Sequence, residues 1–393
     1  MSTFMKKILW PYYGITFFIM AVILFWGLSG VLGGGGHTYR VFIFYAIIPG
    51  ITGVVGVILG LKNACMKWFY PVLSGIFAFL IYYVVFQHAF TILPGYAYFF
   101  VPFLPALIGL GIGVFIWNIN PRYTMRLKGV IKMLLIIGFV VILIHVIHAL
   151  TLDRIIEYKE VAFYSPNVSS DLDGYRIAFI ADTHSISEER LWSIVNELNQ
   201  KELDLVIHGG DFSPFIDKMQ RTVEILSHIE TADGIFGVEG NHDRHVTLFA
   251  TMRAHGMTPL SNSGLSIREN FFLAGVEDLW NRNPSISEAL VGSKPEDFVL
   301  LIAHNPDITM QQNTTGVDLI LSGHTHGGQI TFFGIWAPYL TFRSSITDYG
   351  QRFRAGWSLS QDGTPVFVSR GTGEYLPRVF ARPQVILVTL FRE

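Results

Sequence analysis

The stretch RIAFIADTH, residues 176–184, runs from an apolar, strand-like segment straight into an aspartate and a histidine. Short apolar runs of this kind recur up to the C-terminal end of the sequence, and segments with helical patterning lie between them. Such alternation predicts βαβ units and therefore an α/β fold. Because the C-terminal part is richer in strands, two packed sheets are favoured over one doubly wound sheet. The predicted strands are 176–181, 203–208, 234–238, 271–274, 298–303, 319–321, 366–368 and 385–390, and the predicted helices are 188–200, 217–229 and 246–255.

The first 150 residues differ in composition from the rest of the chain. They contain nine lysines and arginines and no aspartate or glutamate, whereas residues 151–393 hold the other 19 basic and all 30 acidic residues, a formal net charge of −11. This acidic balance argues against a nucleic-acid-binding domain, which needs a basic surface. The sequence therefore predicts a transmembrane domain at 1–150, a linker at 151–175 that leads into the soluble part, and a soluble domain at 176–393.

Five apolar stretches in the first 150 residues are each long enough to span a bilayer, which takes about 20 residues. Basic residues prefer the cytoplasmic side of short loops, and with a cytoplasmic N-terminus seven of the loop lysines and arginines fall on that side. The prediction is a multi-pass α-helical membrane domain in the cell membrane, with the soluble domain outside the cytoplasm. The five stretches are 8–32, 41–61, 69–90, 96–117 and 129–150.

Two histidines, His145 and His148, lie near the predicted outer end of the fifth span. They are three positions apart, so they share one helix face. We expect them to be interfacial polar residues that pack under the soluble domain. The alternative is a polar patch that receives a lipid headgroup.

Metal-capable side chains follow five of the predicted strands, at the point where each strand ends. In open α/β sheets, ligands bind at the carboxyl ends of the strands. Glycines accompany these side chains and allow the backbone to approach a ligand closely. The five clusters together predict one shared site. In chain order they contain Asp182 and His184, then Asp211, then Asn241, His242 and Asp243, then His304, and finally His324 and His326.

The donor types in these clusters indicate which ions would bind. Carboxylates, imidazoles and one amide, with no thiolate, suit divalent cations such as Mn, Fe, Zn or Mg. Seven candidate ligands are too many for one ion, but two ions that share a bridging carboxylate would use them all. Two ions ~3.5–4 Å apart can hold both the attacking and the leaving oxygen of a phosphoryl displacement. The sequence therefore predicts two divalent metal ions.

The ordered motifs, from Asp182-x-His184 to Gly323-His324-x-His326, resemble those of the calcineurin-like metallophosphoesterases. The form GHTHGGQ at 323–329 is similar to the bacterial membrane-associated branch, which includes enzymes similar to UDP-2,3-diacylglucosamine hydrolase. The resemblance covers roughly residues 170–393. It implies a four-layer α/β sandwich, in which two central sheets are flanked by helices.

The resemblance also implies two metal sites that share one carboxylate. One site would consist of Asp182, His184, Asp211 and His326, and the other of Asp211, Asn241, His304 and His324.

Two further catalytic roles follow from the same resemblance. A metal-bridging hydroxide would attack phosphorus, and His242 would contact the phosphate and protonate the leaving oxygen. Asp243 would orient His242, as carboxylates commonly orient imidazoles. Arg370 and Arg378 are candidates for substrate binding, because arginine suits bidentate contact with phosphate; the alternative for both is an ordinary surface salt bridge.

These observations predict a membrane-anchored, dinuclear metal-dependent phosphodiesterase or related phosphoesterase that hydrolyses a phosphate ester or anhydride. A lipid-linked or cell-envelope substrate is favoured, because a diffusible substrate would not need five spans. One alternative is a pyrophosphohydrolase of the UDP-2,3-diacylglucosamine type at the cytoplasmic face, which the predicted topology opposes. An alternative of another class is a non-catalytic membrane scaffold or transporter, which the scarcity of ionisable residues within the predicted spans argues against.

Overall fold

The computed structural model describes residues 48–61, 67–81, 97–118, 121–184, 186–342, 346–373 and 378–393. The chain forms two compact units, Met1–Leu143 and Ile144–Glu393. The division between them falls within one long helix, α7 (Pro121–Leu150), between Leu143 and Ile144.

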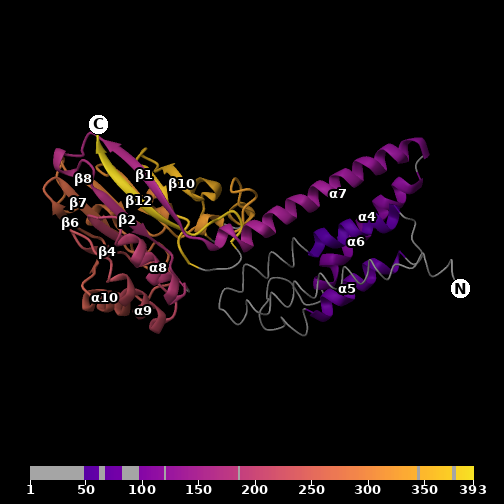
Figure 1. Ribbon diagram of the computed structural model, residues 1–393, viewed down its shortest axis with the longest axis horizontal. Helices are drawn as coiled ribbons and strands as arrows, with labels where there is room; N and C mark the ends of the chain where they lie inside the picture. Colours follow the sequence, from indigo (N-terminus) through magenta and orange to yellow (C-terminus); the bar gives the residue numbers. More distant parts are fainter. Residues whose placement is uncertain are drawn as a thin grey trace. The chain divides into compact units, whose positions relative to one another are not determined.

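The first unit is built of apolar helices (Figure 1). Glycines allow two of them, α4 and α6, to pack with their backbones in contact. A Cβ atom added at Gly56 would lie 2.4 Å from the carbonyl oxygen of Ala106, and one added at Gly109 would lie 2.1 Å from that of Gly53. Close packing through small residues is typical of helices that associate in a membrane. The described helices are α4 (Ile48–Leu61), α5 (Phe69–Ile81), α6 (Ala97–Asn118) and α7 (Pro121–Leu150), whose last turns belong to the second unit.

Among the described residues, one helical segment, Ile136–Arg154, is long and apolar enough to cross a membrane. The apolar segments Gly50–Leu61 and Pro102–Asn118 are shorter than the ~20 residues that a span requires. The predicted span at 8–32 lies outside the described residues. The predicted spans at 41–61 and 69–90 lie partly outside them. With one qualifying segment, the described part of the chain does not support the predicted multi-pass domain.

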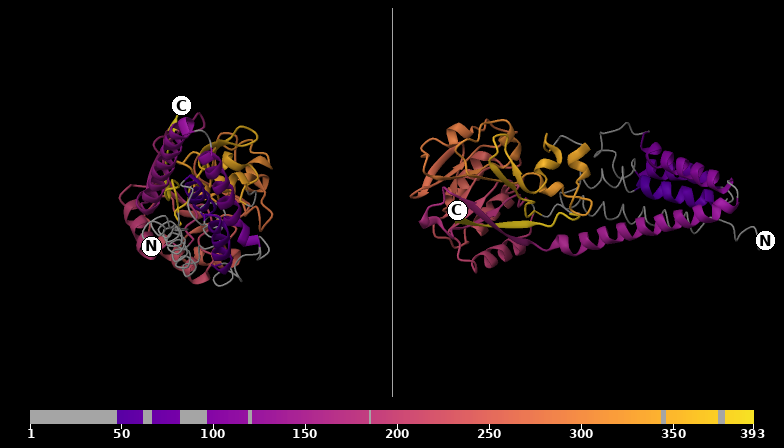
Figure 2. Two further views of the ribbon diagram at one scale, coloured as in Figure 1. Left: turned by 90° about the vertical axis from the view of Figure 1, so that its right-hand side faces the viewer. Right: turned by 90° about the horizontal axis from the view of Figure 1, so that it is seen from above.

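The second unit contains two mixed sheets with helices, which agrees with the predicted α/β class (Figures 1 and 2). Its strands are β1 (Glu157–Ser165), β2 (Arg176–Ile180), β3 (Leu205–His208), β4 (Ile235–Gly237), β5 (Thr258–Pro259), β6 (Ser263–Arg268), β7 (Phe271–Gly275), β8 (Phe298–Ile302), β9 (Leu319–Ser322), β10 (Gly356–Leu359), β11 (Pro365–Val368) and β12 (Gln384–Arg392). Its α-helices are α8 (Glu188–Leu198), α9 (Ile216–Leu226), α10 (His245–Ala254), α11 (Ile286–Ala289) and α12 (Pro338–Phe342). Its 3-10 helices are η3 (Leu152–Arg154), η4 (Ser170–Leu172), η5 (Pro306–Met310), η6 (His326–Gly328) and η7 (Gly350–Phe353).

Each sheet has six strands, four of which are parallel neighbours. The first sheet has the order β1-β12-β2-β3-β4-β5, with β2 to β5 parallel and β12 antiparallel to β2. The second has the order β10-β11-β9-β8-β7-β6, with β11, β9, β8 and β7 parallel and an antiparallel strand at each edge. The parallel strands of each sheet therefore point their carboxyl ends the same way.

Alternation along the strands builds the core. In β2, Ile177 and Phe179 are buried against residues of the second sheet such as Leu300, whereas Ala178 and Ile180 are buried among the helices α8, α9 and α10. This is the two-sided burial expected of a parallel strand between two layers. The outer face of the second sheet is covered by α11, η5 and η7. The result is four layers, two sheets with a covering of helices on each side.

The segment 151–175, predicted as a linker, contains a strand. β1 pairs in parallel with β12 along its whole length, from Glu157 opposite Gln384 to Ser165 opposite Arg392. Only its second half has alternating burial, and its first half carries exposed charges, as is common for an edge strand. The short strands β5, β6 and β10 were also not predicted, whereas the eight predicted strands correspond to β2, β3, β4, β7, β8, β9, β11 and β12.

Candidate metal centre

The predicted ligands lie in loops that leave the carboxyl ends of parallel strands in both sheets. The register brings these ends level within each sheet. Ile180 of β2 pairs with His208 of β3, and Ile302 of β8 pairs with Leu321 of β9. Main-chain hydrogen bonds join the ligand loops directly; one runs from the N–H of His184 to the carbonyl of Asp211 (3.1 Å). The strand ends therefore place side chains from distant parts of the sequence in one site.

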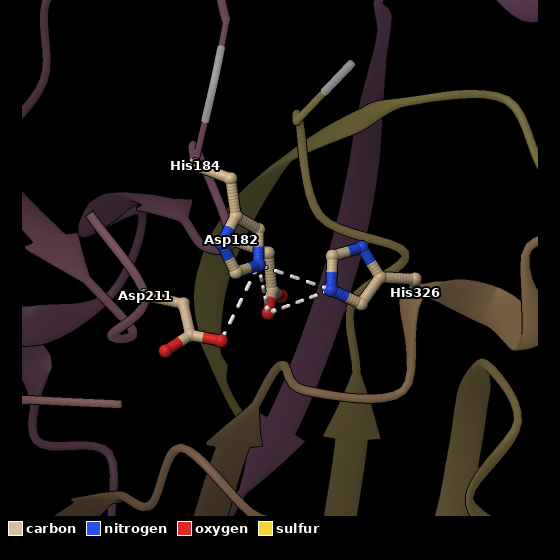
Figure 3. Close-up of side chains that lie close together, drawn as sticks. All are labelled: Asp182, His184, Asp211 and His326. Atoms are coloured by element: carbon tan, nitrogen blue, oxygen red, sulfur yellow. Dashed lines mark hydrogen bonds and ion pairs between the residues drawn. The ribbon is translucent and has the colours of Figure 1, made fainter. Parts of the chain in front are cut away.

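The first group of candidate ligands contains two carboxylates and two imidazoles (Figure 3). Asp182, His184, Asp211 and His326 each place one ligand atom within 4.8 Å of all the others. Nε2 of His184 lies 3.1 Å from Nε2 of His326 and 3.3 Å from Oδ2 of Asp211. Nε2 of His326 lies 3.6 Å from Oδ1 of Asp182. Figure 3 shows both imidazole rings turned toward the Asp182 carboxylate, so the four donors face a common centre.

The second group shares Asp211 with the first. Asp211, His304 and His324 also place ligand atoms within 4.8 Å of one another. Nε2 of His304 lies 3.3 Å from Oδ2 of Asp211 and 3.3 Å from Oδ1 of Asn241. Nδ1 of His324 lies 3.3 Å from the same His304 nitrogen. The structure thus brings all seven predicted ligands together in two adjoining groups.

Hydrogen bonds behind the second group orient its imidazoles. Nδ1–H of His304 donates to the carbonyl oxygen of Gly209 at 2.8 Å, and Nε2–H of His324 donates to that of Ile346 at 2.9 Å. Each bond directs the other nitrogen of the ring toward the site. Partners of this kind, which hold a ligating imidazole from behind, are typical of metal sites.

Backbone strain is concentrated at the ligands. A positive φ is uncommon for residues other than glycine, and such strain gathers at functional sites. The five ligand residues with positive φ are Asp182 (52°), His184 (43°), Asp211 (57°), His324 (70°) and His326 (51°).

Two glycines allow the ligand loops to meet. A Cβ atom at Gly240 would lie 2.3 Å from Oδ1 of Asp211, and one at Gly323 would lie 2.5 Å from Oδ2 of Asp182. Only glycine permits the backbone to pass this close to a carboxylate. The glycines that precede Asn241 and His324 in the sequence are therefore required by the packing of the site.

The two carboxylates of the first group have opposite pKa shifts. Burial raises the pKa of Asp182 to about 7. Burial also acts to raise the pKa of Asp211, but the adjacent His304 and His184 outweigh it and hold that pKa well below its usual range. Asp211 is therefore ionised. The charge of Asp211 in turn overcomes the effect of burial on His304 and raises its pKa to about 10.

The other three imidazoles are held neutral. Burial lowers the pKa of His184 and of His324 to about 3, and lowers that of His326 well below its ordinary value. A neutral imidazole is the form that binds a metal ion. These three residues are therefore prepared as ligands near neutral pH.

His242 lies at the exposed side of the site. Its ring is 5.4 Å from that of His184, centroid to centroid, in an edge-to-face arrangement. Its backbone N–H donates to Oδ1 of Asp211 at 2.8 Å. The predicted proton donor is therefore joined to the shared ligand through its main chain, and its ring is in contact with solvent.

Asp243 has a different position from the one expected. Its carboxylate accepts backbone N–H groups of Gly240, Asp211, Phe212 and Ser213 at 2.8–3.3 Å. In the part of the chain that the structure describes, it makes no hydrogen bond to the His242 ring. Asp243 therefore ties the turn at 240–243 to the loop at 211–213, and it acts on His242 through the backbone.

The two predicted substrate-binding arginines have structural partners. Arg378 is buried and donates to the carbonyl oxygens of Gly373, Arg370 and Ala381, each at 2.9 Å. Arg370 forms an ion pair with Glu157. One nitrogen of Arg378 lies 3.5 Å from Nδ1 of the candidate ligand His326, so this arginine borders the site. Contact of either residue with substrate stays a prediction.

The loop that follows β7 adds two residues that the sequence did not single out. The Trp280 ring packs edge-to-face on His324, with centroids 4.4 Å apart, and it is 47% exposed. Nδ2 of Asn281 donates to the carbonyl oxygen of Asn241 at 2.6 Å. This loop begins at the carboxyl end of a parallel strand, as the ligand loops do. The sequence signal that could have found both residues is the position of this loop after the predicted strand 271–274, where Asp278 follows.

The donor set fits a pair of divalent cations. Carboxylates and imidazoles converge in two groups around the buried, ionised Asp211, whose negative charge attracts cations. Nε2 of His184 and Nε2 of His326 lie 3.1 Å apart, so one cation could be bound by both nitrogens. The arrangement can therefore hold metal ions at the carboxyl ends of two sheets. It defines a candidate metal-binding protein.

Comparison with known proteins identifies the family. The sequence profile described as "Calcineurin-like phosphoesterase" matches residues 175–328. The chain belongs to the calcineurin-like metallophosphoesterases, and it is a hydrolase that acts on phosphoric ester bonds.

Three relatives illustrate the similarity. The uncharacterized metallophosphoesterase YkuE of Bacillus subtilis is 29% identical over 256 residues, which cover 60% of this chain and 86% of the relative. The phosphodiesterase YaeI of Escherichia coli is 29% identical over 247 residues, 58% of this chain and 85% of YaeI. A Danio rerio protein named "Transmembrane protein with metallophosphoesterase domain" is 27% identical over 244 residues, 56% of this chain and 54% of the relative.

Proposed function

We propose that this metallophosphoesterase is anchored in a membrane and uses two divalent cations to hydrolyse a phosphate ester or anhydride of a lipid-linked or cell-envelope substrate. The observation that carries the catalytic part is the pair of adjoining ligand groups that share Asp211. The name of YaeI, a phosphodiesterase, favours a diester among the possible substrates.

The residues of the site have separate roles in the proposed hydrolysis. Cations in the two groups would polarise the phosphoryl oxygens and activate a water molecule. Asp211, which belongs to both groups, would bind both cations, and the strained loops around it hold the remaining ligands. His242, exposed beside His184, contacts the phosphate and donates a proton to the leaving oxygen. Proton donation by such a group contributes typically 10²–10⁴-fold to the rate, as an order of magnitude.

Membrane anchoring rests on the apolar helices. The segment Ile136–Arg154 is long enough to cross a bilayer, and the glycine-mediated contact of α4 with α6 is of the kind that membrane helices use. Large side chains of α7 such as Phe139 and Ile142 are more than half exposed, which suits lipid better than water. The printed name of the zebrafish relative describes the same combination of a transmembrane protein and this enzyme domain.

The proposal includes the predicted topology, with five spans and the catalytic domain outside the cytoplasm. A reporter that functions only outside the cytoplasm, fused after Glu393, tests it. Activity of the reporter supports the outer location. A silent reporter, together with an active cytoplasmic reporter at the same position, contradicts it.

Enzyme activity is tested with the purified full chain in detergent. Added Mn²⁺ is expected to allow hydrolysis of bis(p-nitrophenyl) phosphate, and a chelator is expected to stop it. Absence of turnover with each of Mn, Fe, Zn and Mg would contradict the catalytic part. Incubation with a lipid extract, followed by identification of the dephosphorylated product, then tests the substrate class.

A further inference from the structure

The metal-ligand loop continues directly into an apolar hairpin, defined here as residues 332–336. The N–H of Phe332 donates to the carbonyl of Trp336 at 2.7 Å, and the N–H of Ile335 donates to the carbonyl of Phe332 at 3.1 Å. The two central residues, Phe333 and Gly334, have φ of 52° and 73°. A positive φ is strained for a bulky residue such as phenylalanine, and strain of this kind marks functional positions.

The hairpin exposes large apolar side chains. Ile335 is 77% exposed, Phe332 is 51%, Trp336 is 38% and Phe333 is 37%. Clustered exposure of this kind is unfavourable in water, at about 25 cal/mol per Å² of apolar surface. Contiguous apolar patches on a protein surface mark sites that bind a protein, a ligand or a membrane. The hairpin therefore needs a partner.

The end of α7 fixes the position of the hairpin within the second unit. The ring of His145 stacks on Phe332, with centroids 5.4 Å apart, and the ring of His148 stacks on Phe380 at 3.8 Å. Thr331, just before the hairpin, donates its N–H to Val379 at 2.9 Å. The two histidines expected to pack under the soluble domain thus hold the hairpin beside the point where the apolar helix ends.

A buried carboxylate completes this connection. Asp153 accepts the N–H groups of Phe380 and Ala381 at 2.8 and 3.0 Å, and it bonds to Nδ1 of His148 at 2.8 Å. The turn after α7 and the hairpin are consequently both fastened to the segment 379–381. The hairpin cannot move away from the helix end without breaking these bonds.

The surroundings favour a phospholipid bilayer as the partner. Leu152 and Ile155, about half exposed, add aliphatic surface at the helix end. Arginines gather around the same turn: Arg190 donates to the carbonyl of Arg154 at 2.9 Å, and Arg382 donates to that of Ile155 at 2.7 Å. Aromatic and aliphatic side chains next to basic ones, at the end of an apolar helix, are typical of a membrane interface with anionic headgroups.

We propose that the hairpin 332–336 inserts its apolar side chains into the headgroup region of a bilayer and holds the metal-ligand loop at the membrane surface. The inference rests on the proposed membrane anchoring. Only three residues separate His326 from Ile330, where the chain pairs with Val379 at the base of the hairpin. A site held in this way receives the phosphate of a membrane lipid without the lipid leaving the bilayer.

The test uses the full chain in vesicles of phosphatidylcholine and phosphatidylglycerol. Cys65 is the only cysteine, so Ile335→Cys in a Cys65→Ser background accepts a single environment-sensitive dye. Val291→Cys in the same background is the matched control, because Val291 is also highly exposed, at 74%, and follows α11. Lipids that carry a nitroxide quencher near the headgroup are expected to remove most of the fluorescence of the dye at 335 and none at 291.

The other outcomes overturn the inference. If the lipid quencher reduces fluorescence at neither position, the hairpin lies in water. If it reduces fluorescence equally at both positions, bilayer contact is not specific to the hairpin. A dye at 335 that is shielded from lipid quenchers and from aqueous iodide indicates a protein partner, such as a second copy of the chain.

The same samples separate this inference from the proposed function. They are assayed with Mn²⁺ and the soluble substrate bis(p-nitrophenyl) phosphate, whose turnover does not require the hairpin. Turnover without quenching at 335 refutes the hairpin inference alone. Quenching at 335 without turnover refutes the catalytic proposal and leaves the bilayer contact in place.

Discussion

The backbone N–H of His242 donates to Oδ1 of Asp211, while Oδ2 of the same carboxylate faces His184 and His304. One aspartate thus connects the predicted proton donor to both ligand groups. The two residues nevertheless have separate roles. Asp211 acts through its side chain, whereas the bond from His242 uses only the main chain and leaves the imidazole to the substrate.

Replacement of His242 by alanine should remove the proton donor and keep the metal site. Turnover is expected to fall by about 10²–10⁴-fold, with metal content unchanged, because the backbone N–H that binds Asp211 is still present. Steady-state kinetics and elemental analysis measure the two quantities. His255→Ala, at the exposed end of α10, is the control and should retain full activity.

Replacement of Asp211 by alanine should abolish both metal binding and turnover, because both ligand groups lose a shared member. The measurement is metal content after dialysis against a replete buffer, together with hydrolysis of bis(p-nitrophenyl) phosphate. Unchanged activity in this variant would refute the shared-ligand assignment.

Replacement of Asp243 by asparagine should weaken metal binding without removing any direct ligand. The new amide N–H₂ would face backbone N–H groups, including that of Asp211, which the carboxylate now accepts. Changes behind a metal ligand typically lower affinity by about 10–100-fold. Titration with Mn²⁺ checks this, and an affinity equal to that of the unchanged protein would show that the turn does not position Asp211.

In the metal-free protein, the contribution of Asp182 to stability should fall as the pH rises toward 7. Its pKa in the fold is about 7, above the ordinary value of 3.8, so the folded state binds the extra proton. The contribution is complete below about pH 4 and disappears as the pH passes 7. In thermal melts with chelator, the stability of the unchanged protein relative to that of Asp182→Asn is expected to fall between about pH 5 and pH 7.5. Identical pH dependence in both proteins would contradict the shift.

Replacement of Asp153 by alanine should destabilise the second unit. The backbone N–H groups of Phe380 and Ala381 would lose their acceptor, and each buried donor left unpaired costs about 1–3 kcal/mol. For a domain of this size, a loss of 1 kcal/mol lowers the melting temperature by about 2–4 °C. Asp171→Ala, at an exposed position, is the control. Equal melting temperatures for the two variants would count against the role of Asp153.

The sequence predicted the fold where burial was two-sided. The segment that became β2 reads as an apolar run because both of its faces are covered, and the same holds for β3 and β8. β1 could not be recognised in this way. It lies at an edge, its first half carries exposed charges, and its pairing with β12 joins residues more than two hundred positions apart.

The candidate site was predicted from residue types, because metal-binding side chains follow successive strands in one order. The sequence could not show which hydrogen bonds the side chains of the site make with one another and with the backbone. Asp243 was expected to contact the His242 ring, but its carboxylate accepts hydrogen bonds from backbone N–H groups instead. Trp280 and Ile346 contact His324 from loops whose positions depend on packing alone.

The sequence by itself determined which residues can bind metal, which strands are buried and which part of the chain is apolar, since these follow from side-chain chemistry and local periodicity. Only the tertiary structure decided which donors share Asp211 and which groups accept from Arg378 or donate to Asp243. It also decided that the apolar hairpin lies at the end of α7. Those relations depend on contacts between distant segments, and such contacts are set by the packing of two sheets rather than by any local pattern.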